Sequence, residues 1–306
     1  MKKQLKIVCL IPCLNEEKTL GKVIRDLKKN ISGIQIHVFD NNSDDNSLNV
    51  ARKNGVFTHV VMEKGKGNVV RRMFADVEGD IFIMVDADDT YELIQLKTMI
   101  DNLINEDLDM IVAKRISIEP EAYRIGHRLG NKIFTNIVKL TFGHAINDLF
   151  SGLRVFSRRF VKSFPANSRG FEVETELTIH ALEQRLPISE IECKYKARPE
   201  GSISKLSTFT DGLRILNVIF ILIKDEKPLM FFSSLSFFFI IFSLYLGIPI
   251  IFDFFETGLV EKMPSAVLAG LNMIIAFLCF FSGLVLDIIK KSRHERKRLN
   301  YLMIKK

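Results

Sequence analysis

The 306-residue chain has few cysteines, and their spacing excludes the common cysteine frameworks. Cys9, Cys13, Cys193 and Cys279 form no paired Cys-x-x-Cys and no metal-finger spacing. Cys9 falls in a strand pattern and Cys279 in an apolar helix pattern. The pattern therefore favours a reduced, cytosol-facing protein with incidental cysteines.

Two standard nucleotide-binding motifs are absent as well. The chain has no G-x-x-x-x-G-K-[ST], and no G-x-G-x-x-G follows its first strand pattern. It does contain Gly65-Lys66-Gly67, where the backbone could approach a phosphate at a helix N-terminus. By itself this motif is more often only a turn. Residues 1–4 lead into a short strand pattern, so we expect no signal peptide.

Positive charge is concentrated at one end of the chain. The net charge is +7, and residues 290–306 alone hold eight Lys/Arg against one Glu. The rest of the chain is therefore neutral overall. A nucleic-acid binder would place its basic surface on the folded domain, so we expect no nucleic-acid partner.

The first half of the chain alternates strand and helix patterns. Apolar runs at residues 5–11, 34–39, 57–62 and 81–85 are separated by helical patterns, and Pro12 is expected to stop the first strand. This alternation predicts an α/β fold with a mostly parallel sheet covered by helices. Polar turns follow residues 11, 39 and 85. Ligands bind at the carboxyl ends of such strands, so these turns predict a site.

The acidic turn Asp86-Ala87-Asp88-Asp89 follows the fourth of these strands. Adjacent carboxylates repel unless a cation lies between them. Mg²⁺ or Mn²⁺ suits such oxygen ligands and leaves room for substrate phosphates. The alternative for an isolated D-x-D is a solvated turn without a ligand.

Later segments have simpler interpretations. Residues 123–142 form a basic amphipathic pattern, typical of an ordinary surface helix and compatible with a membrane surface. Asp148 and Arg154 flank Gly152, where a structural ion pair is the usual explanation. The acids after Gly170 suit the dipole of a helix N-terminus.

Two charge-free runs of 24 residues, 229–252 and 263–286, predict a transmembrane hairpin. Each would span about 36 Å as a helix, whereas the apolar segment 213–223 spans only about 16 Å and is expected to lie in the interface. The connecting loop has a net charge of −2 and the tail +7. The positive-inside rule therefore places the N-terminal domain and the tail in the cytosol.

Six motifs in this order, ahead of the hairpin, resemble the family 2 glycosyltransferases of the polyprenyl-phosphate type. They are Ile11-Pro12-x-Leu14-Asn15-Glu16, Asp40-Asn41-Asn42-Ser43, Gly65-Lys66-Gly67, Asp86-Ala87-Asp88, Asp148-x-x-Ser151-Gly152-Leu153-Arg154, and Arg198-Pro199-Glu200-Gly201-Ser202-x-Ser204-Lys205-Leu206. The resemblance implies a GT-A-type, Rossmann-like domain at residues 1–206. A juxtamembrane interfacial helix (207–227), two transmembrane helices (228–289) and a basic tail (290–306) would follow.

The resemblance also implies roles for individual residues. It assigns Pro12, Leu14, Glu16 and Asp40 to the nucleoside, and Lys66 and Asp86 to the donor diphosphate. It assigns Asp86 and Asp88 to the metal, with Thr90 at a position where related enzymes often have Gln. It directs Arg115, Arg128, Arg198, Ser202 and Lys205 toward phosphates of the donor or the lipid.

The expected reaction is an inverting, metal-dependent transfer of a hexose from a nucleotide sugar, with UDP preferred, to polyprenyl phosphate. A phosphate acceptor has a second pKa near 6 and is already largely the nucleophile at pH 7. Asp148 is therefore predicted to orient groups or act as a weak base. Two alternative functions fit the same sequence: a transferase that extends a lipid-linked or surface glycan on an alcohol acceptor, and a non-catalytic membrane scaffold. Copies of the chain could also associate through the Phe-rich helices.

Overall fold

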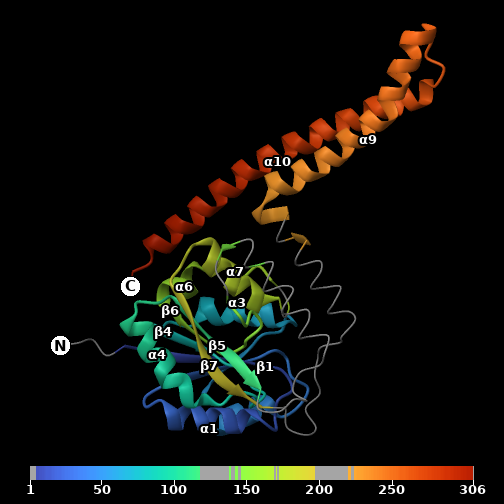
Figure 1. The fold of residues 1–306 in the computed structure, drawn as a ribbon. Coiled ribbons are helices and arrows are strands. Elements are labelled where there is room, and N and C mark those ends of the chain that lie inside the picture. The colour runs from blue at the N-terminus through green and yellow to red at the C-terminus, as the bar shows by residue number, and fades with distance from the viewer. Residues whose placement is uncertain are drawn as a thin grey trace. The chain divides into compact units, whose positions relative to one another are not determined.

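A seven-stranded sheet forms the centre of the first of two units in the computed structural model. The structure describes residues 5–117, 138, 142–143, 146–168, 170, 172–196, 220–221 and 224–305. One unit comprises Met1–Ile215 with Lys297–Lys306, and the other comprises Leu216–Arg296. The strand order is β3-β2-β1-β4-β6-β5-β7 (Figure 1). Only β6 runs antiparallel to its neighbours, so the predicted α/β class with a mostly parallel sheet is confirmed.

The seven strands of the sheet include four at the expected apolar runs 5–11, 34–39, 57–62 and 81–85. The seven are β1 (Ile7–Cys13), β2 (Gln35–Asp40), β3 (Phe57–Val60), β4 (Ile81–Met84), β5 (Met110–Ser117), β6 (Arg154–Ser157) and β7 (Ile188–Tyr195).

The expectation that Pro12 stops the first strand is wrong, because β1 continues to Cys13. Leu10 O accepts from Val85 N on the β4 side, and Cys13 O accepts from Asn41 N on the β2 side. Backbone groups of successive residues face opposite neighbours, so Pro12 faces β4. Pairing with β4 ends at Leu10, and the missing N–H of proline therefore costs no ladder bond there.

Helices cover both faces of the sheet (Figure 1). One face carries α1 (Leu20–Asn30), α2 (Ser47–Lys53), the short 3₁₀ helix η1 (Leu93–Gln95) and α4 (Leu96–Asn105). The other carries α3 (Lys66–Asp76), α6 (Arg158–Ser163) and α7 (Val173–Glu183).

Alternation along the strands divides the core into two layers. Ile83 of β4 belongs to the cluster that packs on α1 and α4. Phe156 of β6 lies 4.9 Å from Phe160 of α6 and 5.6 Å from Phe74 of α3, between ring centroids. Central strands buried on both faces read as continuous apolar runs, which is why these segments show no polar alternation.

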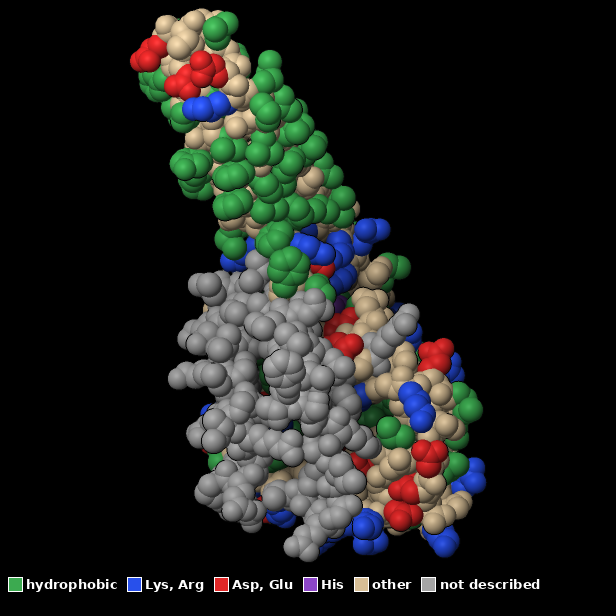
Figure 2. Space-filling model, turned by 90° about the vertical axis from the view of Figure 1, so that its right-hand side faces the viewer, with side chains coloured by type: hydrophobic (Ala, Val, Ile, Leu, Met, Phe, Trp, Pro, Cys, Tyr) green, Lys and Arg blue, Asp and Glu red, His purple; other side chains and the backbone are tan. Residues whose placement is uncertain are grey.

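Two helices are long and apolar enough to cross a membrane, α9 (Pro228–Thr257) and α10 (Met263–Met303). The second unit contains all of α9 and α10 as far as Arg296. Only 17% of the apolar window of each helix is buried, whereas a core helix of a soluble protein would be mostly buried. Hydrophobic side chains cover the hairpin in Figure 2, with mostly acids among the charged groups at one end and several Lys/Arg at the other. Ser243 Oγ donates to Ala269 O at 2.8 Å between the two helices. The segment that the sequence set apart as a tail continues α10 as far as Met303.

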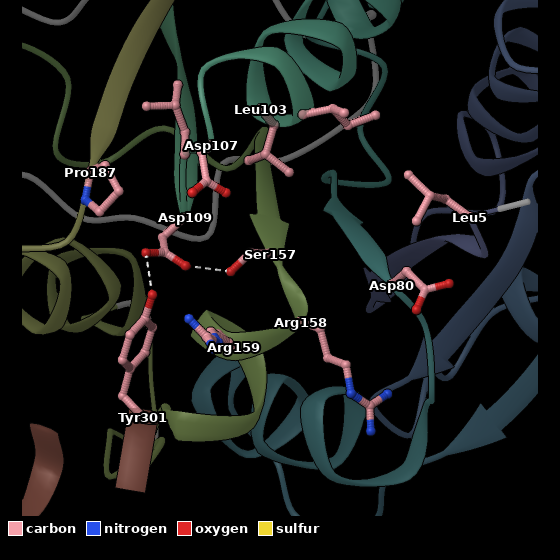
Figure 3. Close-up of a pocket in the computed structure, with 12 residues that line it drawn as sticks. Leu5, Asp80, Leu103, Asp107, Asp109, Ser157, Arg158, Arg159, Pro187 and Tyr301 are labelled. Atoms are coloured by element: carbon pink, nitrogen blue, oxygen red, sulfur yellow. Dashed lines mark hydrogen bonds between the residues drawn. The ribbon is translucent and has the colours of Figure 1, made fainter. Parts of the chain in front are cut away.

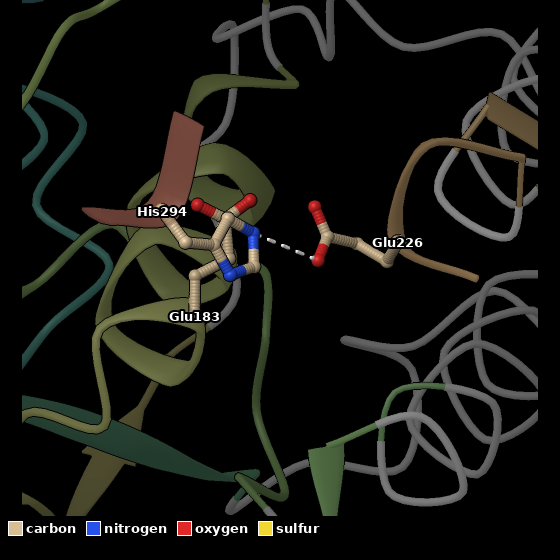
Figure 4. Close-up of side chains that lie close together, drawn as sticks. All are labelled: Glu183, Glu226 and His294. Carbon is tan, nitrogen blue, oxygen red and sulfur yellow. Dashed lines mark ion pairs between the residues drawn. The ribbon is translucent and has the colours of Figure 1, made fainter. Parts of the chain in front are cut away.

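A buried carboxylate forms ion pairs at the basic end of this hairpin. Glu226, 3% exposed, pairs with Arg293 at 2.9 Å. It also pairs with His294 at 3.3 Å, as Figure 4 shows. The ion pairs join the residues before α9 to the cytosol-predicted end of the membrane-length part of α10. The expected helices at 123–142 and 207–227 fall largely outside the described residues.

Candidate active site

The loops after β1 and β2 are tied together by side-chain to backbone hydrogen bonds. Ser43 Oγ accepts from Asn15 N at 2.9 Å, and Asn15 Oδ1 accepts from Asp44 N at 2.8 Å. Asn15 has a φ of 53°, which asparagine tolerates better than most residues. Asp40, 3% exposed, accepts from Ser43 N at 3.0 Å. The first two polar turns therefore form one rigid wall.

A buried amide joins this wall to the third strand and to the Gly-Lys-Gly turn. Asn41 Nδ2 donates to Val61 O at 3.0 Å and to Glu63 O at 2.7 Å. Its Oδ1 accepts from Gly65 N at 2.7 Å. One side chain thus joins the loop after β2 to the loop between β3 and α3 at the carboxyl edge of the sheet.

Lys66 is the first residue of α3, and its ammonium group lies between two carboxylates. Nζ is 2.5 Å from Asp86 Oδ1 and 2.5 Å from Glu174 Oε1. Gly65, with a φ of 125°, directs the chain into the helix at this point, a conformation that favours glycine. Burial alone would lower the pKa of Lys66, but the carboxylates of Asp86 and Glu174 outweigh it and raise that pKa. The turn therefore delivers a fixed positive charge to the acidic loop.

Asp86 lies against the backbone of Gly152. A Cβ on Gly152 would fall 2.0 Å from Asp86 Oδ2, so only glycine leaves room for this carboxylate. Gly152 N donates to Tyr91 Oη at 2.8 Å, and Tyr91 Oη also lies 3.2 Å from Ser151 Oγ. Burial raises the pKa of Tyr91, so the phenol keeps its proton at neutral pH. The Asp148–Arg154 motif and the acidic turn thus meet at a single close approach.

Asp88 and Thr90 form the second part of the acidic turn. Thr90 Oγ1 donates to Asp88 Oδ1 at 2.6 Å, and both residues are buried. Asp86 and Asp88 offer hard carboxylate oxygens, and Asp86 already forms an ion pair with the ammonium group of Lys66. This donor set fits Mg²⁺ or Mn²⁺. Thr90 is placed to orient Asp88 through its hydroxyl, and its role as a direct ligand stays a prediction.

Asp89 points away from this pair. Its φ is 56°, and its carboxylate forms an ion pair with Lys22 Nζ of α1. The hydrogen bond to Asp89 raises the pKa of Lys22. Asp89 therefore anchors the acidic turn to α1, a role that no spacing in the sequence indicated.

Asp148 binds Arg115 at the end of β5. Arg115 Nε donates to Oδ2 and Nη2 to Oδ1, both at 2.7 Å, and Arg115 N donates to Oδ2 at 3.1 Å. The guanidinium also lies 5.3 Å from the centroid of the Tyr195 ring. A carboxylate engaged on both oxygens holds an arginine in place, which fits the predicted orienting role.

The expected ion pair between Asp148 and Arg154 is not formed. Arg154 is fully buried and donates to Ser151 O at 2.9 Å, Leu149 O at 2.7 Å and Thr178 Oγ1 at 2.8 Å. Burial lowers the pKa of Arg154 to about 10. Arg154 fixes the loop that carries Gly152, and Arg115 of β5 binds the Asp148 carboxylate instead.

Most predicted site residues come together at the carboxyl edge of the sheet. Those at or just beyond strand ends or on the adjoining loops are Pro12, Leu14, Glu16, Asp40, Lys66, Asp86, Asp88, Thr90, Arg115 and Asp148. The predicted Arg128, Arg198, Ser202 and Lys205 lie outside the described residues.

Three residues of the site were missed from the sequence: Asn41, Tyr91 and Glu174. Glu174 had a signal, because Gly170-Phe171-Glu172-Val173-Glu174-Thr175-Glu176 is unusually acidic, but the helix dipole explained it. The 5% exposure of Glu174 shows that one of these acids is buried rather than solvated.

A separate cavity of about 350 Å³ lies at the other end of the strands. It is lined by residues that precede β1, β4 and β5, including Leu5, Asp80 and Asp109 (Figure 3). Tyr301 Oη donates to Asp109 Oδ2 at 2.8 Å. The cavity contains none of the predicted site residues.

Comparison with known proteins identifies relatives of this chain. Residues 8–164 match the family model "Glycosyl transferase family 2". Protein RfbJ of Shigella flexneri is 50% identical over 123 residues, covering 40% of this chain and 95% of that protein. Glycosyltransferase AglJ of Haloferax volcanii is 27% identical over 300 residues, covering 96% and 98%. A dolichyl-phosphate hexose transferase of the same organism is 26% identical over 213 residues, covering 70% and 92%.

Solved structures share the fold. Glucosyl-3-phosphoglycerate synthase from Mycobacterium tuberculosis, in complex with Mn²⁺, UDP and glucosyl-3-phosphoglycerate, superposes with a TM-score of 0.55 at 21% identity. The superposition covers 72% of this chain and 79% of that chain. It confirms the Rossmann-like GT-A fold expected for the catalytic unit.

Proposed function

The chain belongs to glycosyltransferase family 2, and we propose that it transfers a hexose from a nucleotide sugar to a polyprenyl phosphate by inversion, with a divalent metal. One observation carries the proposal. Asp86, Asp88 and Lys66 converge at the carboxyl edge of the sheet, in a chain that also has two helices of membrane length. The relative named a dolichyl-phosphate hexose transferase supports a lipid phosphate as acceptor.

The donor would bind along the wall formed by the loops after β1 and β2. Pro12, Leu14, Glu16 and Asp40 border the proposed nucleoside position. Asp40 is held by Ser43, so its carboxylate is oriented before any ligand arrives. UDP is our preferred leaving group.

The diphosphate would lie over the acidic turn, between Lys66 and Asp88. A divalent ion held by Asp86 and Asp88 would neutralise the charge that develops on the departing diphosphate. Lys66 already contacts Asp86 and would add positive charge at the same place. Thr90 would keep the Asp88 carboxylate oriented through its 2.6 Å hydrogen bond.

The acceptor would need orientation more than activation. Arg115, locked by Asp148, is the described cation best placed for an acceptor phosphate. We also propose Arg128, Arg198, Ser202 and Lys205 for phosphates, as the family resemblance implies. Because a phosphomonoester is largely ionised at pH 7, Asp148 is proposed to position Arg115 rather than to remove a proton.

The apolar hairpin would hold this site at the cytosolic face of a membrane. The basic end of the hairpin adds attraction to anionic lipids of about 1 kcal/mol per cation near the surface. We propose that the catalytic unit and the chain end share the cytosolic side.

The proposal is tested with membranes that contain the full chain. Labelled UDP-glucose, UDP-N-acetylglucosamine and GDP-mannose are each supplied with Mn²⁺ and polyprenyl phosphate. We expect a one-sugar lipid that mild acid cleaves, absent when Asp88 is replaced by Asn. Label only on a preformed glycan would instead identify an alcohol acceptor and refute the proposal.

A further inference from the structure

We propose that Glu174 is a specificity-determining residue whose free carboxylate oxygen accepts hydrogen bonds from hydroxyls of the transferred sugar. The inference rests on the proposed transfer from a nucleotide sugar and identifies the side chain that would read the sugar. Neither the sequence motifs nor the roles implied by the family resemblance include this residue.

Glu174 has one engaged and one unpartnered oxygen. Oε1 is 2.5 Å from Lys66 Nζ, while Oε2 is buried and has no hydrogen-bond partner among the residues that the structure describes. Its side chain is 6% exposed. Leaving a buried acceptor unsatisfied costs about 1–3 kcal/mol, more for a charged group. Such a group beside the residues of a candidate active site points to a ligand that completes it.

Lys66 determines where this oxygen lies relative to the donor. The same ammonium group contacts Asp86 Oδ1 and Glu174 Oε1, so the two carboxylates are separated by one shared cation. The proposed donor has its nucleoside at the loops after β1 and β2 and its diphosphate over Asp86 and Lys66. The group on the other side of the diphosphate would then reach Glu174. In a nucleotide sugar that group is the hexose.

Charge explains why the ligand group would be neutral. Asp86 and Glu174 share one lysine, which leaves the cluster with an excess negative charge. A phosphate would be repelled from the free oxygen of Glu174. An ionised carboxylate only accepts hydrogen bonds, so it favours neutral O–H donors. Hexose hydroxyls meet both conditions, and their geometry differs between hexoses.

The first turns of α7 provide a matched control. Glu176 lies two residues later and accepts from Asn167 N at 2.9 Å and Ser168 N at 2.8 Å. Both of its oxygens are used in fastening a loop. Glu176→Gln removes a charge from the same helix without touching the Lys66 cluster.

The experiment measures binding by the purified full chain with Mn²⁺, using calorimetry without acceptor. The probes are UDP, UDP-glucose, UDP-N-acetylglucosamine, GDP and GDP-mannose. We expect wild type to bind one nucleotide sugar more tightly than its own nucleoside diphosphate. Glu174→Gln should weaken that nucleotide sugar about 10- to 100-fold, as expected for hydrogen bonds to a charged group. Its affinity for the nucleoside diphosphate should stay within about threefold, and Glu176→Gln should match wild type in both.

Three results would overturn the inference. An equal loss for the nucleotide sugar and the nucleoside diphosphate would mean that Glu174 only supports Lys66. Unchanged binding by Glu174→Gln, or a wild type that gains nothing from the sugar, would also remove it. If Glu174→Gln does not fold, as judged by thermal melting, Glu174→Asp decides. It keeps the charge and withdraws the carboxylate by one methylene, so a selective loss for the sugar is again expected and an equal loss refutes it. A wild type that binds in this way but does not glycosylate polyprenyl phosphate would refute the proposed acceptor alone.

Discussion

Replacing Gly152 with alanine should disable the enzyme by moving one carboxylate. The new Cβ would lie 2.0 Å from Asp86 Oδ2 and 2.7 Å from Asp86 Cγ. Contacts under 3.0 Å essentially never occur for a Cβ, so Asp86 or the Gly152 loop must shift by about 1 Å. The loop is held by Arg154, whose guanidinium is buried and donates three hydrogen bonds to oxygen atoms. Asp86 is 26% exposed and is the part that can move.

The size of the effect follows from that displacement. A misplacement of about 1 Å in a catalytic group costs about 100-fold in rate, which is about 2.7 kcal/mol of transition-state stabilisation. We therefore expect Gly152→Ala to lower kcat/KM for the nucleotide sugar about 100-fold and to raise the Mn²⁺ concentration needed for half-maximal activity. The assay is glycolipid formation by the full chain across a Mn²⁺ series.

Gly21→Ala provides the control. Its Cβ would have no neighbour closer than 3.4 Å, an ordinary contact, within helix α1 of the same unit. We expect its activity and Mn²⁺ dependence to match wild type. Full activity of Gly152→Ala with an unchanged Mn²⁺ requirement would refute the proposed role of Asp86 in holding the metal. Loss of activity accompanied by unfolding at the assay temperature would instead make Gly152 a residue of stability.

Three further predictions test the surrounding site and the core. Thr90→Val removes the hydroxyl that orients Asp88 and should weaken Mn²⁺ activation about 10- to 100-fold; Thr90→Ser should restore it, and an unchanged Mn²⁺ titration would exclude the orienting role. Asp148→Asn should lower the activity, because Arg115 loses the carboxylate that holds it. The remaining activity should keep an unshifted pH profile, because no general base is lost. An enzyme that is inactive at every pH but still binds donor and lipid normally would make Asp148 essential to the chemistry. Burial, and after it the nearby Lys297, lowers the pKa of His180 to about 3, so the folded state favours the neutral ring. The free energy of unfolding should therefore fall as the pH drops from about 6.5 toward 3, by up to about 1.4 kcal/mol per pH unit. Denaturant unfolding of His180→Leu should show a flatter dependence over this window, and an identical slope would contradict the assignment.

The apolar periodicity predicted the arrangement of the catalytic unit well. Strands β2 and β4 begin and end within one residue of the predicted runs, because central strands of a parallel sheet are largely apolar. The two membrane-length helices were equally predictable from the sequence, since runs of 24 residues without charge are rare outside membranes. The error at Pro12 arose because a proline is harmful only where its N–H would meet a neighbour. That depends on where the adjacent strand ends.

Side-chain pairing was less predictable than the position of the elements. The sequence placed Asp148 opposite Arg154, six residues away, whereas the structure pairs it with Arg115, 33 residues away. The partner depends on the antiparallel insertion of β6 between β4 and β5, which brings the end of β5 to the Asp148 loop. The helix dipole accounted for the acids after Gly170 in the sequence, and only their burial in the structure separates Glu174 from the half-buried Glu172 and Glu176.

The acidic turn illustrates what each level of information determined. The sequence by itself established that three carboxylates follow a buried strand, because an apolar run and its polar end are local properties of the chain. The tertiary structure alone decided their division of labour: Asp86 faces Lys66 and Gly152, Asp88 faces Thr90, and Asp89 pairs with Lys22. Thr90 belongs to the turn itself, but Lys22, Lys66 and Gly152 come from α1, from α3 and from the loop before β6, and long-range packing rather than spacing brings them to the turn.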